Sequence, residues 1–528
     1  MTQELPPRFR YRPVLRLVCA ALAGVAATAA AKTVDISAAG AKPGDPTPVT
    51  ALIQRVIDDV SAAGGGTVII PTGTFVSAPI QLRSHVTLRL ERGAVLRYTD
   101  NPADSRQARG FVFADECEDT GIEGPGAIDG NGRVFEQRDS APGRPHLLDL
   151  HNSRNVTVRE VTLRNAASWT FRLQGCDGVR VHAIRIYSHQ GYNNDGIDID
   201  SRNVAISDCL IDCDDDAICF KSDTATPCEN VTVTNCVAAS NCNLIKFGTA
   251  SVGGFKNITV SNCVLHAASE DNRWQWKKRM EGVALDTTGI SGIALEVVDG
   301  GVMDQICLTN IAMTGIQTPI FIRLGNRRNG PGRLGNVVIS NITATTESLI
   351  ASSITGLPGN PVEGVVLRDI RVEVLGTGTA AHAAKPVPEK EKNYPENRMF
   401  GHSLPTYALY VRHAKGITLD NVQFTLRHPD ARPALVFDDA HEIDLRSLRA
   451  EPSTPAAPLV RIARSSRIAV DGFRTAQPLG QFAQLEDCAP GALTLLSNDF
   501  SRVEKVSNVS DDHSATTKSA DGVRAAPR

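Results

Sequence analysis

Three things are scarce in this chain of 528 residues: aromatic side chains, net charge and helical periodicity. Phe, Trp and Tyr make up only 5% of the sequence, which is typical of a thin core filled by Val, Ile, Leu and Ala. The formal net charge of −3 gives no reason to expect nucleic acid or an anionic membrane as a partner. No helical period of apolar residues recurs along the chain, which argues against a horseshoe of alternating strands and helices.

A strand-like repeat fills most of the sequence. Eleven short segments each begin with a turn residue, continue with alternating apolar positions and end in a polar break. Three consecutive ones read NVAISDCLI from Asn203, NVTVTNCVA from Asn230 and NITVSNCVL from Asn257, with starts 27 residues apart. The other starts are Asn155, Gly178, Gln305, Asn336, Gly364, Gly416, Glu442 and Arg467. Most gaps are 23 to 31 residues, and a period of this size with a strand in each unit indicates a stacked solenoid.

The repeat predicts an all-β fold. Val or Ile at alternate positions indicates a strand with one buried face. The most economical arrangement is a single right-handed parallel β-helix, with one coil per repeat and three or four short strands per coil. Its corners need Gly, Asn and Asp, and the chain has 43 Gly. Cys209, Cys236 and Cys263 occupy the same place in three consecutive repeats, so we expect an inward ladder of thiols that needs no disulfides.

The first 31 residues have the features of a targeting segment. Arginines between Arg8 and Arg16 precede an apolar run from Leu17 to Ala31 that ends in Ala-x-Ala patterns. The run is short and alanine-rich for a membrane span, so we expect a cleaved signal peptide at 1–31 and a secreted or periplasmic protein without membrane contact. Eleven cysteines would remain, an odd number that leaves at least one thiol without an intramolecular partner and leaves the pairing open.

A single domain is expected over residues 32–506, because the repeat never stops long enough to bury a second core. An N-terminal cap at about 33–99 would close the open end of the solenoid, with an amphipathic helix within 47–63. The stretch 377–402, rich in Ala, Pro, Glu and Lys, is predicted to be an excursion from the coil. Residues 507–528 are polar, and we expect them to form a disordered tail.

Two acidic runs differ from the repeat background: GYNNDGIDIDS from Gly191 and DCDDDAICFKS from Asp212. Asp195 precedes Asp215 by 20 residues and Asp216 by 21, a little under one coil, so these acids are expected to meet on adjacent coils. Glycosidic bond hydrolysis needs one carboxylic acid to protonate the leaving oxygen and one or two carboxylates to activate water. Like charges so close raise the pKa of one carboxyl, which keeps the acid protonated.

Two other interpretations account for the same acids. Asp and Asn are common at solenoid corners, where they cap the turn, and this interpretation suits Asp198, Asp200 and Asp214 individually as well as a role in a site does. A Ca²⁺ site also gathers carboxylates from adjacent coils.

The two acidic motifs carry a resemblance to a known family. NNDGIDIDS resembles the N-T-D-G-I-D signature of glycoside hydrolase family 28, the polygalacturonases and their relatives, and DDAICFKS resembles that family's D-D-C-I-A-I-K-S. Earlier runs, GPGAIDGNG and APIQLRSHVTLRLERGAVL, extend the likeness over about 64–420. The resemblance implies a pectin-lyase-like right-handed parallel β-helix and an inverting mechanism. It implies Asp215 as the general acid, Asp195 and Asp216 as the residues that hold and deprotonate the water, and Asn193 as the matching Asn of that loop.

The chain departs from the family pattern where a substrate carboxylate would bind. The family's G-H-G places Cys242 at the usual His, and its R-I-K places Ala294 and Glu296 where Arg and Lys are expected. Those cations ordinarily hold a uronate beside the scissile bond, and Glu296 would repel one. Lys246 and Arg323 are the candidate substitutes, although either could equally be a solvated or turn-bonding residue.

The substrate-binding candidates are polar or ionisable residues around the three acids: Asn193, Asp198, Cys242, Lys246, Glu296 and Arg323. A basic and aromatic loop is a further candidate wall, because sugar rings stack on aromatic faces: Trp274, Trp276, Lys277, Lys278 and Arg279.

The sequence therefore predicts a secreted, inverting, monomeric glycoside hydrolase that acts on a pectic polysaccharide or oligosaccharide without a metal or other cofactor. Inversion would separate acid and base by roughly 6.5–9.5 Å. The absence of the family's Arg and Lys favours rhamnogalacturonan, a substituted pectin or a neutral side-chain sugar over plain homogalacturonan as the substrate. The alternatives are a Ca²⁺-dependent polysaccharide lyase on the same solenoid and a non-catalytic carbohydrate-binding β-helix. The lost His, Arg and Lys favour the latter, and the three intact acids argue against it.

Overall fold

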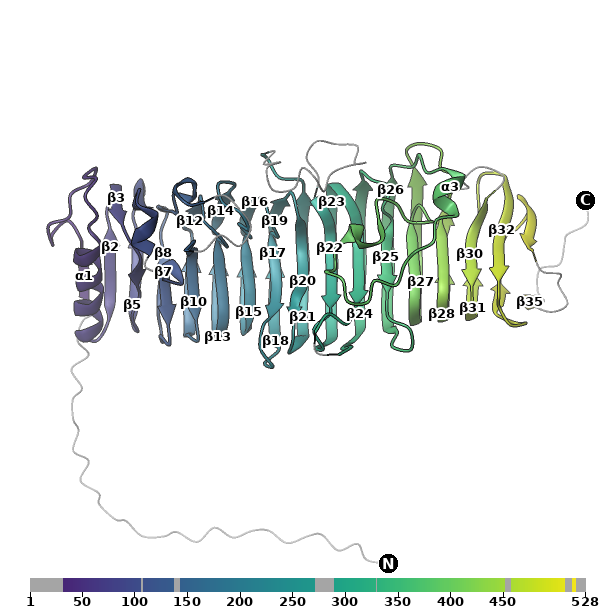
Figure 1. Ribbon diagram of the computed structural model, residues 1–528, viewed down its shortest axis with the longest axis horizontal. Coiled ribbons are helices and arrows are strands. Elements are labelled where there is room, and N and C mark those ends of the chain that lie inside the picture. The colour runs from purple at the N-terminus through teal and green to yellow at the C-terminus, as the bar shows by residue number, and fades with distance from the viewer. Residues whose placement is uncertain are drawn as a thin grey trace, which may run out of the picture.

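The computed structural model describes residues 32–105, 108–136, 143–270, 289–328, 330–451, 457–508 and 515–518. They form a right-handed parallel β-helix, as predicted, whose coils stack along one long axis (Figure 1). Strands on successive coils pair in parallel throughout, for example from Val204 to Val231 to Ile258 on three consecutive coils. Within the described ranges, no helix has the length and apolar character needed to cross a bilayer.

Each coil contributes to three sheets that run along the axis. The first sheet holds β1 (Lys32–Asp35), β2 (Gly66–Ile70), β5 (Val86–Leu90), β8 (Gly121–Glu123), β11 (Arg154–Arg159), β18 (Cys228–Thr234), β31 (Ser466–Asp471), β33 (Leu493–Leu496) and β35 (Ala515–Lys518). The second holds β3 (Gly73–Ser77), β6 (Ala94–Tyr98), β9 (Ala127–Asp129), β12 (Thr162–Arg164), β14 (Arg185–Ser188), β16 (Leu210–Cys213), β19 (Val237–Ser240) and β29 (Arg449–Ala450).

The third sheet positions the candidate site. It holds β4 (Ile80–Gln81), β7 (Gly110–Asp115), β10 (His146–His151), β17 (Ile218–Ser222), β20 (Asn243–Ser251), β22 (Gly289–Val297), β25 (Ser352–Thr355), β30 (Pro458–Ala463), β32 (Leu479–Glu486) and β34 (Val503–Ser507). Longer strands bend from one sheet into the next: β13 (Phe171–His182), β15 (Ile197–Ser207), β21 (Gly254–His266), β23 (Val302–Leu324), β24 (Arg333–Thr346), β26 (Val362–Val374), β27 (Leu409–Leu426) and β28 (Leu435–Arg446).

The corners explain why so many repeats start with Asn or Gly. All eleven repeat starts have a positive φ, between 52° and 74°. This left-handed conformation costs most side chains free energy, but Asn and Gly adopt it readily. The asparagines also bond to one another along the axis: Asn230 Nδ2 donates to Asn203 Oδ1 at 3.0 Å, and Asn257 Nδ2 donates to Asn230 Oδ1 at 3.1 Å. Asn therefore adopts the left-handed backbone conformation of the corner and also forms the hydrogen bonds between coils.

The N-terminal end of the coil is covered by the helix α1 (Thr50–Ala62), within the segment where we expected one. Its apolar stripe, Ile53, Val56, Ile57 and Val60, is buried against the first coils. Short 3₁₀ turns η1 (Pro102–Ser105) and η2 (Gly132–Val134) follow. The helix thus replaces the missing neighbour of the first coil.

The thiol ladder forms as expected. Cys209, Cys236 and Cys263 are buried at the same place on consecutive coils. None of the eleven cysteines in the described ranges is in a disulfide. The open question of pairing is therefore answered for those eleven: they act as small apolar side chains.

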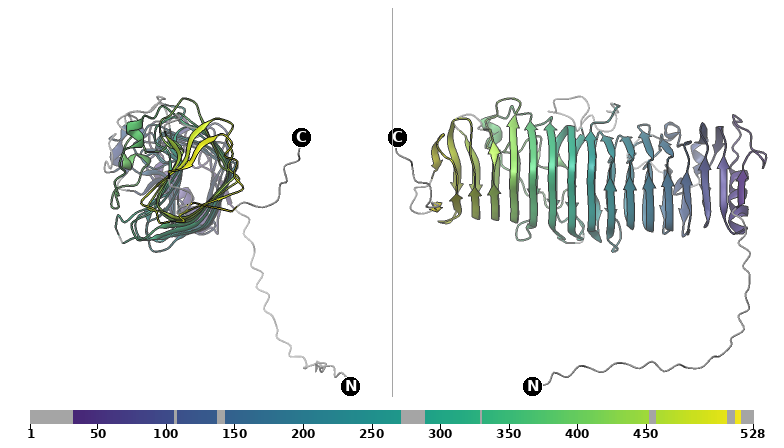
Figure 2. Two further views of the ribbon diagram at one scale, coloured as in Figure 1. Left: turned by 90° about the vertical axis from the view of Figure 1, so that its right-hand side faces the viewer. Right: turned by 180° about the vertical axis from the view of Figure 1, so that it is seen from behind.

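The chain leaves the coil between β26 and β27, over residues 375–408, where it forms a short helix α3 (Ala380–Ala383) and a 3₁₀ turn η4 (Asn397–Phe400). Seen along the axis, this green segment lies outside the stacked coils on one side (Figure 2). Near the other end, the segment that we expected to be disordered contains β35, which pairs with β33, for example Thr494 with Thr516. The last coil has a free strand edge, and the backbone of the tail pairs with it.

Candidate active site

The start of the third sheet brings the three predicted acids together. Asp195 lies two residues before β15, and Asp216 lies two residues before β17. The backbone N–H of Gly196 donates to the carbonyl of Asp216 at 2.8 Å, so these corners lie on adjacent coils. Side-chain ligand atoms of Asp195, Asp216 and Cys219 lie within 4.8 Å of one another, as do those of Asp215, Asp216 and Cys242. All are buried, so Asp216 is the shared member of a compact polar cluster.

Two buried lysines neutralise this cluster. Lys221 Nζ lies 3.6 Å from Asp195 Oδ2 and 3.2 Å from Asp198 Oδ1. Lys246 Nζ lies 3.0 Å from Asp216 Oδ2. Buried charges persist only when paired, so the lysines are what allows several carboxylates to share one dry corner. Sequence reasoning missed Lys221, although it lies in the motif DDAICFKS and alternates with apolar neighbours as Lys246 does.

The pKa values of the neighbouring acids are driven apart. Burial raises the pKa of the Asp215 carboxyl, and the charge of Asp216 raises it further. Burial acts in the same direction on Asp216, but the ammonium groups of Lys246 and Lys221 outweigh it and lower the pKa of Asp216 to about 2. Asn243 Nδ2 also donates to Asp216 Oδ1 at 2.8 Å. Asp215 therefore keeps its proton to higher pH than Asp216 does.

Asp195 is the third acid of the cluster. Burial raises its pKa well above the usual range, and the charges of Asp198 and Asp215 raise it further. Asn193 lies beside the pair from the loop before β15: its Nδ2 is 3.5 Å from Asp215 Oδ2, and its Oδ1 accepts from Arg144 Nη2 at 3.1 Å. The structure therefore brings Asn193 to the acids.

We expected roughly 6.5–9.5 Å between the carboxyl groups of an inverting pair, and this stays a prediction. The nearest oxygens of Asp215 and Asp216 lie within 4.8 Å, because the two residues are consecutive in the chain and both turn toward the same corner. Asp195 and Asp216 have the same upper limit, and Cys219 Sγ lies within it of both.

The structure distinguishes the roles of three acids that the sequence left open: Asp198, Asp200 and Asp214. Asp198 joins the cluster through Lys221, and burial raises its pKa to about 6. Asp214 accepts a hydrogen bond from Asn241 Nδ2 at 2.8 Å, and Asp200 accepts one from the backbone N–H of Asp223 at 3.1 Å. Asp214 and Asp200 thus bond as corner residues do, while Asp198 faces the catalytic candidates.

Cys242, at the position where the family has His, lies beside the acids. Burial raises the pKa of its thiol well above the ordinary value, and the charges of Asp216 and Asp215 raise it further. The thiol is therefore neutral. It cannot supply the positive charge that a histidine would bring to this corner.

Glu296 does not behave as we predicted. It is fully buried, and burial raises its pKa to about 8, so its carboxyl is mostly protonated at neutral pH. Its Oε1 has no hydrogen-bond partner among the described residues. The prediction of a repelling charge here is wrong at neutral and acidic pH, because an exposed carboxylate was assumed. Ala294, which pairs with Lys246 on the previous coil, brings no cation either.

Arg323 was a candidate to replace the missing cation of the family pattern. The structure instead buries it, with Nη1 donating to the carbonyl of Gly356 at 3.1 Å. Its Nη2 donates to the carbonyls of Glu389 at 3.0 Å and Lys390 at 3.2 Å. The guanidinium is therefore committed to the 375–408 segment, and the expectation of a substrate contact is not supported.

The aromatic residue at the cluster is Trp169, which the sequence did not single out. Lys221 Nζ lies 4.7 Å from its ring centroid and Arg172 Cζ lies 5.4 Å from it. His146 stacks on the ring at 5.0 Å. The loop around Trp274 and Trp276, which we expected to form a wall, lies outside the described residues.

The donor set does not suit Ca²⁺. That ion takes six to eight oxygen ligands. Each candidate trio offers two carboxylates and one thiol, and two lysine ammonium groups occupy the space beside them. This argues against the Ca²⁺-dependent alternative.

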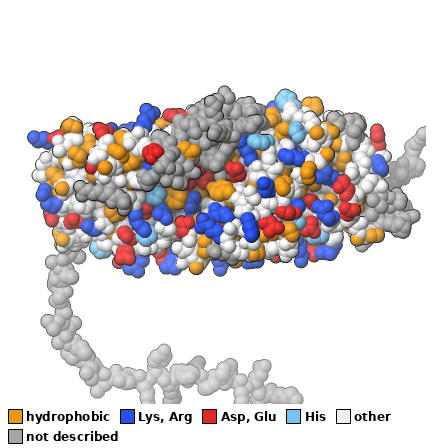
Figure 3. All heavy atoms as spheres, in the orientation of Figure 1, with side chains coloured by type: hydrophobic (Ala, Val, Ile, Leu, Met, Phe, Trp, Pro, Cys, Tyr) orange, Lys and Arg blue, Asp and Glu red, His pale blue; other side chains and the backbone are white. Residues whose placement is uncertain are grey.

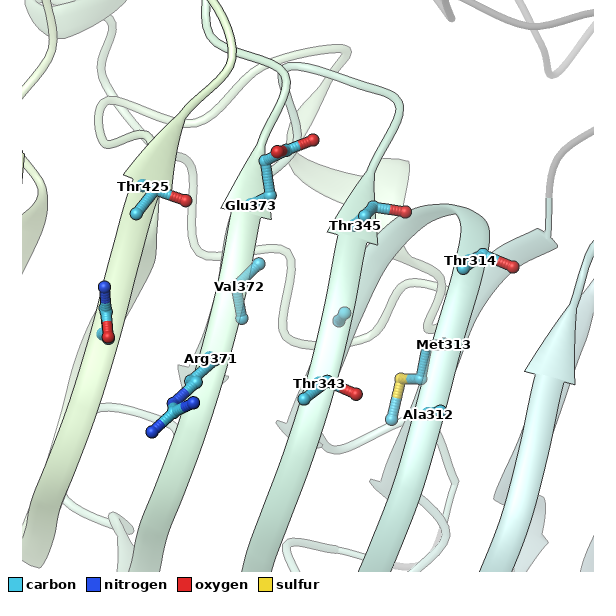
Figure 4. Close-up of a pocket in the computed structure, with 11 residues that line it drawn as sticks. Ala312, Met313, Thr314, Thr343, Thr345, Arg371, Val372, Glu373 and Thr425 are labelled. Carbon is cyan, nitrogen blue, oxygen red and sulfur yellow. The ribbon is translucent and has the colours of Figure 1, made fainter.

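Two hollows lie away from the acids. One, of about 350 Å³, is on the second sheet and is lined by Thr314, Thr343, Thr345, Arg371 and Glu373 with neighbouring side chains (Figure 4). It brings no carboxylates from adjacent coils together. The other, of about 550 Å³, is bordered by His151, Gln174, Asp200 and Thr226, on the coils of Asp195 and Asp216 and the two coils before them. Charges of both signs are interspersed over the face of the molecule in Figure 3.

Comparison with known proteins agrees with this geometry. The family described as glycosyl hydrolases family 28 matches residues 61–391. A Vitis vinifera protein named "Probable polygalacturonase" is 28% identical over 200 residues, which are 33% of this chain and 41% of that protein. An endo-polygalacturonase of Pectobacterium carotovorum subsp. carotovorum is 26% identical over 212 residues, 34% of this chain and 52% of that protein.

The matched stretch thus spans about half, or less, of those relatives. Among solved structures, a hyperthermoactive exopolygalacturonase from Thermotoga maritima has a TM-score of 0.58 at 21% identity. The likeness covers 75% of this chain and 92% of that one, and it supports the fold.

Proposed function

The chain belongs to family 28 of the glycosyl hydrolases, and from this premise we propose that it hydrolyses glycosidic bonds in a pectic polysaccharide or oligosaccharide. The observation that supports this most is the pair Asp215 and Asp216, neighbours whose pKa values are raised and lowered respectively. A protonated acid beside an ionised carboxylate is what acid–base hydrolysis of an acetal needs.

In this proposal Asp215 donates its proton to the glycosidic oxygen as the bond to the anomeric carbon breaks. Asp216 takes a proton from the attacking water, and Asp195 holds that water from the adjacent coil. Lys246 and Asn243 keep Asp216 ionised through the 3.0 Å ion pair and the 2.8 Å hydrogen bond. Asn193 orients the Asp215 carboxyl.

We propose inversion of configuration, on the family resemblance and on the meeting of Asp195, Asp215 and Asp216 at one corner. The stereochemistry needs its own test. Proton NMR of the first product anomer reports it directly. A retained anomer would mean that Asp195 or Asp216 attacks as a nucleophile.

The proposed substrate carries something other than a plain galacturonate at the subsite beside Lys246. Ala294 replaces the cation expected there, Glu296 is buried and Lys246 is paired with Asp216. A uronate carboxylate leaving water needs a free cation or donor, and each such contact is worth roughly 1.5–3 kcal/mol. Rhamnogalacturonan or a substituted pectin suits this subsite better than homogalacturonan. We further propose secretion after cleavage of 1–31 and action as a monomer.

The test is a product screen on polygalacturonate, rhamnogalacturonan and esterified pectin, with Asp215→Asn as the control. Release of saturated reducing ends by the wild type alone supports the proposal. Unsaturated, ultraviolet-absorbing products that vanish with EDTA would indicate a lyase. Absence of product from both proteins would leave a binding protein without catalysis.

A further inference from the structure

Residues 375–408 cover the outward face of the third sheet on one side of the catalytic candidates. The outward row of the third sheet runs from Lys246 through Ala294 to Phe321, Ser353 and Tyr410 on successive coils. The last three are each only 1% exposed, although they face away from the core of the coil. Figure 1 shows the green segment lying in front of the strands between β22 and β27.

The segment fills this stretch with its own apolar side chains. Phe400 and Leu404 form a small cluster with Ile350, Tyr410 and Val436 on the sheet. These side chains occupy the space in which a sugar chain would lie on an open sheet.

Polar contacts fix the segment in place. Arg412 Nη1 donates to the carbonyl of Val387 at 2.6 Å, and the same guanidinium forms an ion pair with Glu389. Asn397 Nδ2 donates to the carbonyl of Ile290 at 2.9 Å. Arg323 binds two further carbonyls of the segment. These bonds are distributed along the segment, so the segment has a fixed position on the sheet.

On the other side of Lys246 the outward row passes through Cys219 and Asp198 to Arg172, which lies two coils beyond Cys219. Cys219 and Asp198 are buried, and the Arg172 side chain keeps 19% of its surface exposed. The 550 Å³ hollow bordered by Gln174 and Asp200 lies beside this part of the sheet. A carbohydrate chain therefore has room beside Arg172 and in this hollow.

Tyr394 marks the boundary between the covered and the open part. Its ring centroid lies 5.6 Å from Lys246 Nζ, and its hydroxyl lies 3.4 Å from the same atom. Lys246 in turn contacts Asp216, so the ring stands next to the catalytic candidates. It keeps 52% of its surface exposed, which leaves a face for a sugar ring.

We infer that the 375–408 segment ends the groove beside Asp216, and that Tyr394 is the wall against which the end of the substrate stops. The protein then removes units from a chain end and does not cut within the chain. This inference rests on the proposed function and adds the mode of action to it.

The test follows the wild-type chain on each polymer of the pectic panel at low conversion, by product sizing and viscosity. We expect one small product size from the first turnovers, with viscosity falling slowly relative to the release of reducing ends. A ladder of product sizes with an early viscosity drop would overturn the inference while leaving the hydrolase proposal intact. No hydrolysis of any polymer or oligosaccharide would remove the proposed function and this inference with it.

A variant pair tests the wall itself. Tyr394→Ala should raise KM roughly three- to tenfold, since it removes one stacking face, and should add longer products. Lys392→Ala, exposed on the same segment, is the matched control and should behave as wild type. Tyr394→Phe keeps the ring if the alanine variant folds poorly, as judged by its melting temperature, and should retain the single product size. Unchanged KM and product sizes in Tyr394→Ala would overturn the assignment of the wall.

Discussion

Two corners of the coil stack Asn or Asp side chains on successive coils, and only one of them has the features of a catalytic site. At the first-sheet corner, Asn203, Asn230 and Asn257 are exposed and bond to one another. At the third-sheet corner, Asp195 and Asp216 are buried beside lysines. Both corners stack short polar side chains, so charge, depth and pairing make the difference.

The physical reason is solvation. Exposed neutral amides satisfy one another and water at no electrostatic cost, and the corner stays structural. Buried carboxylates lack that option, so they either pair with a lysine, as Asp216 does, or shift toward the protonated form, as Asp215 does. A corner becomes reactive when one of its carboxylates pairs with a lysine while a neighbouring carboxyl shifts toward the protonated form.

The sharpest way to break this comparison is to remove a carboxyl group at the buried corner and add one at the exposed corner. Asp215→Asn should lower kcat by roughly 10² or more, with an unchanged melting temperature, because it deletes the proton donor and keeps the shape. Asn230→Asp, its counterpart at the exposed corner, should keep full activity. Kinetics on the polymer that the wild type hydrolyses measure both. Activity of Asp215→Asn within a few-fold of wild type would exclude it as the general acid.

Removing the pairing should be the next largest effect. Lys246→Met takes away the ammonium that lowers the pKa of Asp216, so that pKa rises. Fewer molecules then carry the ionised base at acidic pH, and the acid limb of the kcat/KM profile moves to higher pH. On that limb, kcat/KM should fall roughly tenfold for each pH unit by which the limb moves. An acid limb that stays in place would show that Asp216 is not the base.

The exposed corner can be tested for its own role. Asn230→Ala should lower the free energy of unfolding by about 1–2 kcal/mol, because alanine resists the left-handed backbone at φ 57° and loses the ladder bonds. Asn230→Gly should cost less, and neither should change kcat. Denaturation midpoints and activity assays compare them. A loss of kcat with retained stability would contradict the structural role.

Glu296→Gln should change the pH dependence of stability. The folded chain holds the Glu296 proton up to a pKa of about 8, against about 4.5 when unfolded. The folded state therefore binds more protons between these values, and wild-type stability falls as pH rises through them, by up to ~1.4 kcal/mol for each pH unit. The glutamine variant should lack this part of the decline. Parallel melting temperatures from pH 5 to 8 for both proteins would contradict it.

The repeat in the sequence was enough to predict the coil and the positions of the acids. The 27-residue period predicts the coil, and the 21 residues from Asp195 to Asp216 place the two acids on neighbouring coils. Glu296 and Arg323 were misjudged because their surroundings come from remote segments. Arg323 bonds to Lys390, 67 residues later, and Glu296 takes its pKa from burial, which no local pattern reveals. Lys221 could have been found, since it follows the same alternation as Lys246.

The hydrogen bonds between coils all point along the solenoid axis, and this decides how the molecule bears force. Pulled from its two ends, the protein would load only the outermost coil, whose ladder opens bond by bond as a zipper does. Each coil of 27 residues then releases roughly 85 Å of slack before the next one is loaded. A force–extension trace should show a series of low, regularly spaced force peaks. The series should be interrupted where the 375–408 segment bonds to several coils.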